Sequence, residues 1–382
     1  MRPPSDQPAP SPAAPDSPAG PAAGPRRRAT IEDVARAAGL SVSTVDRVLN
    51  ARAPVRADTA EQVRQAAEAL DFRGAAVIRE RVRGSRPPRT FGFLLLGSEP
   101  AFYRRLAQAL CEAVEAEPTV RGRALVAYMA DIAPDAVSDS LLEMGRRVDA
   151  VAVVAADHPQ VSAAVEQLRA RGVPTFALMH DLSAPGRAGC ISVDWRRVGR
   201  TAAWFLTRLA PRPGRLALFV GSHRYQGQEL CEMSFRAYVR AHAPQFEVLE
   251  ALVTLENERM AGEILRELLH RESELVGFYV AGGGLEGVLQ ALQAERAAGS
   301  PAGAAGTELI GACHELTEIS RLGLLRGQLH LVQSHPLPAL ARQAVQAMAR
   351  ALAPPQTGLH VGLPIGLQQH LLPMDLHTPE SV

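Results

Sequence analysis

The chain has 382 residues, of which 47% are hydrophobic and 21% charged, and its formal net charge is +1. This length favours two or three folded units, and the composition is typical of soluble globular protein. The longest apolar runs, such as 150–156, are too short to cross a bilayer, and no apolar signal segment follows the N-terminus. Four scattered cysteines without a C-x-x-C pair predict neither a disulfide framework nor a zinc site. We therefore expect a cytoplasmic protein that has no membrane partner.

The N-terminal part of the chain changes character within a few residues. Residues 1–28 are mostly Pro, Ala, Ser and Gly before three final arginines, which predicts a disordered tail. Residues 26–89 hold fourteen arginines against eight acidic residues. Because the folded remainder is slightly acidic, this concentration of positive charge predicts a polyanionic partner for one end of the protein only.

Residues 29–73 show the pattern of three short helices. Thr30, with Asp33 three residues later, is typical of a helix N-terminus, and Gly39 is typical of a helix C-terminus. Ser41 caps a second helix that begins almost at once, and a third follows from Asp58. Two short helices joined by a tight turn that contains glycine predict a helix-turn-helix DNA-binding domain.

The second of these helices presents Val42, Ser43, Thr44 and Arg47 on its outer face. A helix in the major groove reads base edges with residues in its first turns. Arg47 can donate two hydrogen bonds to guanine, and Val42 can contact a thymine methyl group. The alternative is a three-helix scaffold whose arginines are simply solvated. The local surplus of positive charge favours DNA.

From residue 90 onward, apolar runs alternate with helical patterns. Residues 74–89, which are rich in arginine and contain Gly84, Pro87 and Pro88, predict a linker before this region. The alternation predicts an α/β fold with parallel sheets covered on both faces, and two doubly wound lobes suit the number of strands. The predicted strands are 91–96, 124–129, 150–155, 175–178, 189–193, 216–220, 246–253, 276–280, 308–312, 329–332 and a piece near 361–367.

Polar side chains follow several of these strands, at the sheet edge where parallel sheets bind ligands. Carboxylates and hydrogen-bond donors of this kind bind the hydroxyl groups of polyols, although a capping or loop-stabilising role is open for each residue. No G-x-S-x-G turn, metal-ligand set or phosphate loop accompanies them, so we expect neither an enzyme nor a cofactor or metal. The candidate effector-binding residues are Asp157, His158, His180, Asp181, Asp194, Arg224, Tyr225, His314 and Glu315.

Residues 30–50, TIEDVARAAGLSVSTVDRVLN, resemble the DNA-binding headpiece of the LacI/GalR family of transcriptional regulators. The resemblance implies that Val42, Ser43 and Arg47 read bases. Asp46 stands where many members carry serine, and we expect its carboxylate to orient Arg47 or another basic neighbour. The positions at which the family contacts the phosphate backbone are Thr30, Ser41, Thr44 and Asn50.

The chain departs from the family just after the third predicted helix. Family members continue with a Pro-Asn step and a hinge helix that pushes a leucine into the minor groove. Here Arg81 takes the leucine position, with Val82 beside it. Either Val82 acts as the apolar wedge, or the linker binds DNA by charge alone through Arg79 and Arg81. The local arginines favour the second alternative.

The second half of the chain resembles, less densely, the effector domain of the same family, and most of all members whose core is similar to periplasmic sugar-binding proteins. The resemblance implies a periplasmic-binding-protein-like domain over 90–370, with an effector between two lobes, and a C-terminal tail over 371–382. The two lobes are then about 90–192 plus 333–355, and 193–332 plus 356–370.

The predicted cleft also departs from the sugar-binding pattern. Cys231 stands where many members carry arginine, and residues 282–285 lack the Asn or Asp often found there. Without these groups the cleft is less polar. Either the ligand carries fewer hydroxyl groups than a sugar, or the domain has lost ligand control.

Together these features predict a transcriptional repressor that binds a double-stranded DNA operator and is controlled by a small-molecule effector, a sugar or polyol. A homodimer is expected because one headpiece buries too little surface for tight specific binding. Two alternatives remain: a ligand-independent regulator with a degenerate cleft, and a plain solute-binding protein.

Overall fold

The computed structural model describes residues 28–50, 52–53, 55–97, 100–222, 225–299, 309–353 and 369–382. The predicted disordered tail, apart from Arg28, lies outside these residues. The chain forms two compact units, Met1–Ser85 and Arg86–Val382, which we describe separately. In the part of the chain that is described, no helix has both the length and the apolar character needed to cross a bilayer.

The described part of the first unit is built from four helices, α1 (Ile31–Ala38), α2 (Val42–Asn50), α3 (Ala57–Ala69) and α4 (Ala75–Ser85). The capping pattern forms as the sequence predicts. The Thr30 hydroxyl accepts from the Asp33 backbone amide while the Asp33 carboxylate accepts from the Thr30 amide. The helices enclose an apolar core that includes Val34, Val45 and Val63, all fully buried.

The interpretation of residues 74–89 as a linker is wrong for most of that segment, because 75–85 form helix α4. Ile78 is fully buried and Val82 is 4% exposed, and both belong to the core of the first unit. The two side chains are one helical turn apart and form an apolar stripe between arginines on the outer face. The sequence interpretation missed this apolar stripe because it was based on the many arginines of the segment. Val82 is therefore a core residue and is not exposed as a wedge for the minor groove.

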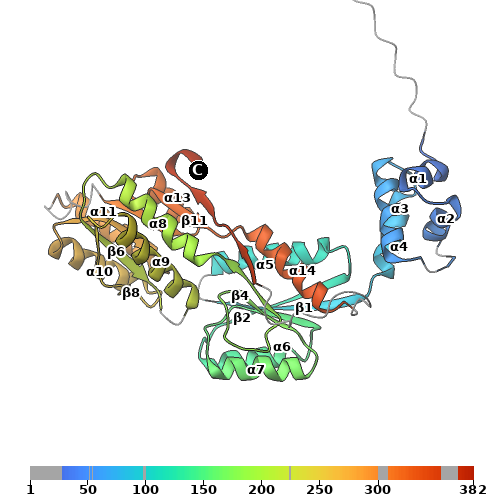
Figure 1. Cartoon of the computed structure of the whole chain (residues 1–382), viewed down its shortest axis with the longest axis horizontal. Coiled ribbons are helices and arrows are strands. Elements are labelled where there is room, and N and C mark those ends of the chain that lie inside the picture. The colour runs from blue at the N-terminus through green and yellow to red at the C-terminus, as the bar shows by residue number, and fades with distance from the viewer. Residues whose placement is uncertain are drawn as a thin grey trace, which may run out of the picture. The chain divides into compact units, whose positions relative to one another are not determined.

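The first lobe of the second unit is a parallel sheet with the strand order β12-β5-β4-β3-β1-β2. Helices α5 and α14 cover one face and α6 and α7 the other (Figure 1). The strands are β1 (Pro88–Leu96), β2 (Arg121–Met129), β3 (Ala150–Val153), β4 (Thr175–Met179), β5 (Gly189–Val193) and β12 (Gln369–Leu372). The helices are α5 (Pro100–Ala116), α6 (Pro134–Met144), α7 (Pro159–Ala170) and α14 (Leu337–Ala351).

The second lobe repeats this plan with the strand order β13-β11-β10-β9-β6-β7, and β8 pairs with β6. Its cores lie on the two sides of the sheet, one beneath α8 and α9 and the other beneath α10 and α11. The strands are β6 (Arg215–Val220), β7 (Glu247–Val248), β8 (Leu252–Val253), β9 (Leu275–Val280), β10 (Ile310–His314), β11 (Leu331–Ser334) and β13 (Asp375–His377). The helices are α8 (Trp195–Leu209), α9 (Gln226–His242), α10 (Glu258–Arg271), α11 (Leu285–Ala297) and α13 (Glu318–Leu325), and a short 3-10 helix (Pro379–Ser381) ends the chain.

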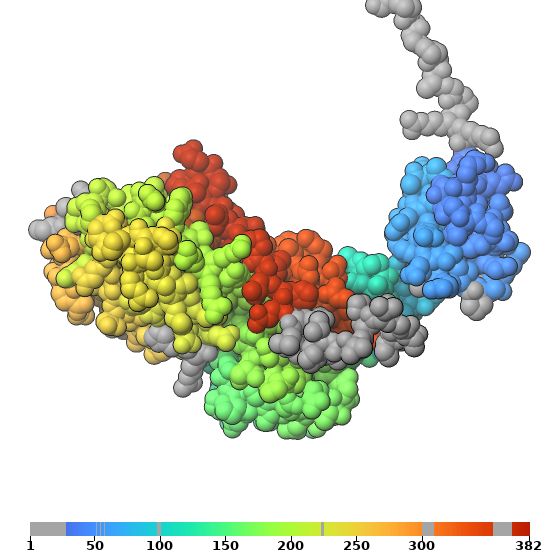
Figure 2. Space-filling model, in the orientation of Figure 1, coloured from blue at the N-terminus to red at the C-terminus, as the bar shows by residue number. Residues whose placement is uncertain are grey.

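The C-terminal segment is not the tail that the sequence suggested. β12 pairs in parallel with β5 in the first sheet, and β13 pairs antiparallel with β11 in the second. Figure 2 shows this red segment running from one lobe to the other. Residues 369–370 therefore lie in the first lobe and not in the second as expected. The two strands escaped notice because each has only three or four residues at a sheet edge, too few for a period to be visible.

Two other strand predictions have different outcomes. The single strand expected over 246–253 is broken into β7 and β8, which pair with the two ends of β6. The strand expected near 361–367 lies outside the described residues.

Candidate DNA-binding surface and effector cleft

Helix α2 buries Val45 and Val48 and exposes the opposite face. Val42 is 46% exposed, and Ser43 and Arg47 are also exposed. Among the described residues, no hydrogen bond or ion pair is formed by the Arg47 side chain, so its guanidinium is available for an external acceptor. The local cause is the apolar spacing of Val45 and Val48, which turns the remaining residues of the short helix outward.

The polar residues at the start of α2 form a small cluster. The Ser41 hydroxyl lies 3.0 Å from the Ser43 hydroxyl and 2.8 Å from that of Thr44, and it accepts from the Thr44 amide. Hydroxyl and amide groups at a helix N-terminus are the type of donor that binds phosphate. This cluster keeps Ser41 and Thr44 candidates for phosphate contact.

Asp46 has different partners from the one we expected first. Its carboxylate accepts from Asn50 Nδ2 at 2.5 Å and from Arg52 Nη1 at 3.2 Å, and no contact joins it to Arg47 in the described chain. Asp46 therefore orients Asn50 and balances the charge of Arg52. Asn50 remains a predicted phosphate contact, and its side-chain amide is held by the hydrogen bond to Asp46.

Arg79 and Arg81, the predicted contacts of the linker, are held by the helical unit itself. Arg79 Nε donates to Glu68 at 2.7 Å, and Arg81 donates to the backbone carbonyl of Leu49. The hydrogen bond from Arg79, together with one from Arg64, holds the pKa of Glu68 below its usual range. Both arginines stay exposed on α4. Their contacts fix α4 against α2 and α3.

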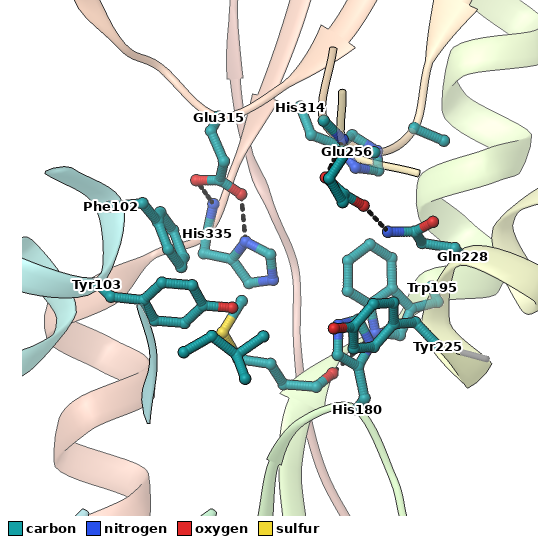
Figure 3. Close-up of a pocket in the computed structure, with 15 residues that line it drawn as sticks. Phe102, Tyr103, His180, Trp195, Tyr225, Gln228, Glu256, His314, Glu315 and His335 are labelled. Carbon is teal, nitrogen blue, oxygen red and sulfur yellow. Dashed lines mark hydrogen bonds and ion pairs between the residues drawn. The ribbon is translucent and has the colours of Figure 1, made fainter. Parts of the chain in front are cut away.

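In the second unit, a pocket lies between the two sheets at the carboxyl ends of β1, β4, β9 and β10. We call it the histidine pocket, and its volume is about 100 Å³. Seven of its fifteen lining residues carry an aromatic or imidazole ring, and these rings are drawn as sticks in Figure 3. The principal lining residues are Phe102, Tyr103, His180, Trp195, Tyr225, Gln228, Glu256, His314, Glu315 and His335.

Trp195 is at the centre of this wall. Its ring stacks on His180 at a centroid distance of 5.4 Å and lies 5.6 Å from His314 and 5.4 Å from His335. The indole Nε1 donates to the Met179 carbonyl at 2.9 Å, which fixes the ring. A Cβ at Gly227 would lie 2.5 Å from the indole, so only glycine permits helix α9 to approach it.

Burial keeps the imidazoles of His180 and His314 neutral. Loss of solvent, reinforced by the neighbouring histidines, lowers the pKa of His180 to about 3. The same loss of solvent lowers the pKa of His314 to about 4. A neutral imidazole offers one donor and one acceptor. In the described structure, Nδ1 of His180 and Nε2 of His335 are buried without a hydrogen-bond partner.

His314 is positioned from behind by a buried chain of polar groups. The Cys231 thiol lies 3.0 Å from the Tyr279 hydroxyl, which in turn contacts Nε2 of His314. Cys231 and Tyr279 are both fully buried. The residue that replaces the arginine expected in sugar-binding relatives therefore supports a pocket residue and does not line the pocket itself.

Two carboxylates complete the pocket. Glu315 contacts Nδ1 of His335 and accepts weakly from its amide at 3.4 Å. Glu256 accepts from Gln228 Nε2 at 3.2 Å and from the Gly283 amide at 2.5 Å. A Cβ at Gly283 would lie 2.0 Å from the Glu256 carboxylate. The glycine run 282–284 thus gives the carboxylate room to reach the backbone.

The structure divides the predicted effector-binding residues among several places. His180, Tyr225, His314 and Glu315 line the histidine pocket. Asp157 and His158 line a second pocket, of about 520 Å³. Arg224 lies outside the described residues.

Three of the predicted residues, Asp181, Asp194 and His158, form hydrogen bonds or ion pairs with other parts of the protein. Asp181 forms a bidentate pair with Arg187, at 2.8 and 3.1 Å, and accepts from Gln369. Asp194 caps α8 and pairs with Arg197 at 3.2 Å. His158 Nδ1 accepts from the Gln160 amide as the cap of α7. For Asp181 and Asp194, these contacts support the loop-stabilising and capping roles that the sequence left open.

Sequence reasoning missed several lining residues. Glu256 and His335 follow the ends of β8 and β11, so the rule that selected the other candidates also applied to them. Trp195 follows β5 after one intervening residue, Asp194, but its side chain is aromatic and the candidates were chosen among polar residues. Phe102 and Tyr103 lie on α5, and only the fold brings that helix to the cleft.

Comparisons with known proteins agree with this architecture. Residues 97–355 match the family described as "Periplasmic binding protein domain", and residues 30–74 match "Bacterial regulatory proteins, lacI family". The regulator MalR of Streptomyces coelicolor is 31% identical over 201 residues, which cover 51% of this chain and 54% of MalR. The match therefore spans about half the length of this curated relative.

Solved structures support the fold of the second unit. GanP, a glucose-galactose binding protein from Geobacillus stearothermophilus, superposes with a TM-score of 0.62 at 14% identity, covering 77% of this chain and 99% of GanP. A solute-binding protein from Agrobacterium vitis, solved with α-D-tagatopyranose, superposes with a TM-score of 0.64 at 15% identity. The match covers 76% of this chain and 95% of that protein.

The two-lobed unit is thus a periplasmic-binding-protein-like domain, as its strand order and interlobe pocket indicate. The chain therefore belongs to the family described as "Periplasmic binding protein domain", and the helix-turn-helix unit that precedes this domain matches the lacI family of bacterial regulatory proteins over residues 30–74.

Proposed function

We propose that this protein is a transcriptional regulator that binds an operator in double-stranded DNA through α2 and responds to a small molecule bound between its two lobes. The observation that carries the proposal is the outer face of α2. Val42, Ser43 and Arg47 are exposed there on a scaffold of the lacI family. The Arg47 guanidinium, which has no partner among the described residues, has the reach and geometry to read a guanine edge from this short exposed helix.

The regulator acts as a homodimer and as a repressor in this proposal. One helical unit offers a single recognition helix, and single modules bury about 600–1,000 Å² of protein surface on DNA, at the low end for specific complexes. Two copies related by a two-fold axis would read two half-sites. Effector binding would change the lobe arrangement and so the affinity for DNA, by no more than the effector's differential affinity for the two arrangements.

The effector we propose is a sugar or polyol derivative. The histidine pocket combines aromatic faces with neutral imidazoles and two carboxylates. Such a lining offers hydrogen-bond donors and acceptors to hydroxyl groups and flat apolar surfaces to a ring. GanP, which shares the fold of the second unit, is named as a glucose-galactose binding protein, and this name agrees with the proposed class.

A second candidate is a regulator that works without an effector. The volume of the histidine pocket, about 100 Å³, favours this candidate. An apolar cavity of about 150 Å³ holds benzene, so this pocket alone holds no complete sugar ring in the present arrangement. A ligand must therefore either open the lobes or use additional space.

The test is footprinting of the full chain on the DNA upstream of its own gene, with Arg47→Ala as the variant. The substitution should lower affinity by about 1–3 kcal/mol and relax the preference at one base position, because a bidentate contact is lost. A uniform loss on every sequence would mean that Arg47 touches only phosphate. No protected region at all would contradict the proposal.

A further inference from the structure

The second pocket lies next to the histidine pocket and differs from it in chemistry. We call it the apolar pocket because six of its lining residues are Ile132, Pro134, Val137, Ala156, Val161 and Leu255. These residues come from loops and helices of both lobes. Its volume of about 520 Å³ is within the usual range of about 300–1,000 Å³ for small-molecule sites.

Tyr225 and Glu256 belong to the walls of both pockets. Figure 3 shows them on the side of the histidine pocket opposite Phe102 and Tyr103. A ligand in the apolar pocket therefore lies beside a phenol and a carboxylate. Beyond these two groups are the imidazoles of His180 and His335, each with a buried nitrogen that lacks a partner in the described structure.

The backbone around the two pockets is held in unusual conformations. Of the five non-glycine residues with positive φ in the described chain, four line these pockets: Met179, Leu255, Glu256 and Glu315. Leu255 and Glu256 are consecutive, with φ of 51° and 59°. Such conformations persist only where the surroundings enforce them, and they cluster at binding sites. This turn places the Leu255 side chain, which is 64% exposed, at the apolar pocket.

We propose that the two pockets form one bipartite site for an amphipathic ligand, a glycoside whose apolar group fills the apolar pocket. The hydroxylated part lies against Tyr225 and Glu256 and reaches the unpartnered nitrogens of the histidine pocket. This inference rests on the proposed function and defines its effector class. Because the apolar pocket has walls from both lobes, the apolar group would also link effector binding to the arrangement of the lobes.

Paired ligands test the inference on the full chain. Dissociation constants are measured by calorimetry for D-glucose, D-galactose and D-xylose, for the phenyl β-glycoside of each, and for maltose. For at least one sugar, the phenyl glycoside should bind at least tenfold more tightly than the free sugar, because only it fills the apolar pocket. If free sugars or maltose bind as tightly as the glycosides, or if none of these compounds binds, the inference is wrong.

Variants of the apolar pocket locate the effect. Leu255→Asn keeps a residue that tolerates positive φ but removes the apolar side chain, and Ile132→Ser removes a second one. Both should reduce the advantage of the phenyl glycoside by at least fivefold. The matched control is Met233→Ser on α9, since Met233 is 59% exposed, Ile132 is 55% exposed, and Met233 lines neither pocket. An unchanged advantage in both variants would contradict the assignment.

Operator binding on the same preparations separates the two proposals. If the footprint is present and free sugars bind best, the proposed regulator stands and the bipartite site fails. If the footprint is absent while phenyl glycosides bind best, the site stands and the DNA-binding function fails.

Discussion

At the scale of single residues, the cleft depends on side chains that are buried with unusual neighbours. His180 and His314 lie against Trp195, and burial lowers the pKa of both imidazoles, to about 3 and about 4. In the unfolded chain, a histidine titrates near pH 6.5. The folded state therefore resists protonation of two groups that the unfolded state protonates readily.

This difference predicts how stability depends on pH. Because the folded pKa of His180 is depressed, its contribution is complete above the unfolded pKa of 6.5 and is lost as pH falls towards the folded pKa. Between pH 7.5 and 5.5, the depressed pKa of His180 alone should lower the free energy of unfolding by about 1 kcal/mol. Both tryptophans of the chain lie in α8, so tryptophan fluorescence during urea denaturation reports this unit.

The variant that checks the assignment is His180→Gln, whose side chain does not titrate. Over the same pH range, the free energy of unfolding of the variant should fall by about 1 kcal/mol less than that of the original chain. If the free energy of unfolding depends on pH equally steeply in the variant and the original chain, the pKa of His180 is not depressed.

Gly227 provides a second test at this scale. A Cβ there would lie 2.5 Å from the Trp195 indole and 2.6 Å from His180 Nδ1. Gly227→Ala should therefore destabilise the second unit by about 1–3 kcal/mol and weaken ligand binding, because rings in the pocket must move. Gly84→Ala is the matched control, since nothing lies within 4 Å of a Cβ at that helical glycine. Gly84→Ala should leave tryptophan-monitored unfolding unchanged, and similar curves for both variants would contradict this account.

At the scale of elements, α4 is the helix whose role the structure changes most. Its inner face packs in the core of the first unit, and its arginines are tied to α2 and α3 through Leu49 and Glu68. The wedge alternative for Val82 therefore fails, because a buried side chain is not available to unstack bases. The charge alternative for Arg79 and Arg81 remains a prediction.

Neighbouring residues of α4 give a matched pair of substitutions. Ile78 is fully buried, whereas Val77 is 47% exposed. Ile78→Ala should lower the free energy of unfolding of the first unit by about 2–5 kcal/mol. Val77→Ala should change this free energy by less than about 0.5 kcal/mol. The measurement is amide hydrogen exchange of peptides from α1 to α3, since both tryptophans lie elsewhere. Faster exchange in both variants, or in neither, would mean that α4 is not part of this core.

At the scale of the whole molecule, the sequence predicts architecture well and the cleft only in part. Alternating apolar runs predicted the parallel sheets, because strands buried on both faces are continuous apolar segments. The capping residues Thr30 and Gly39 marked helix α1 because caps are local. Elements with little local signal were missed, such as β12 and β13 at sheet edges and the apolar stripe of α4.

In the candidate site too, residues with a local sequence signal were predicted and the others were missed. His180, His314 and Glu315 were predictable because each lies at or just after the carboxyl end of a strand, and topology brings these ends of parallel strands together. Asp181 and Asp194 follow strands too, but their carboxylates form ion pairs, with Arg187 and Arg197. The sequence analysis did not predict these pairs. Phe102 and Tyr103 reach the pocket through helix placement, which no local pattern encodes.

The most direct test of the central claim is the affinity of the full chain for its footprinted operator, measured by fluorescence anisotropy with and without the tightest-binding glycoside. We predict at least a fivefold change in the dissociation constant on ligand binding, as expected for coupling between two sites. Residues 86–382 alone should show no binding to the same duplex. An affinity that the ligand leaves unchanged, or operator binding by residues 86–382 equal to that of the full chain, would contradict the account.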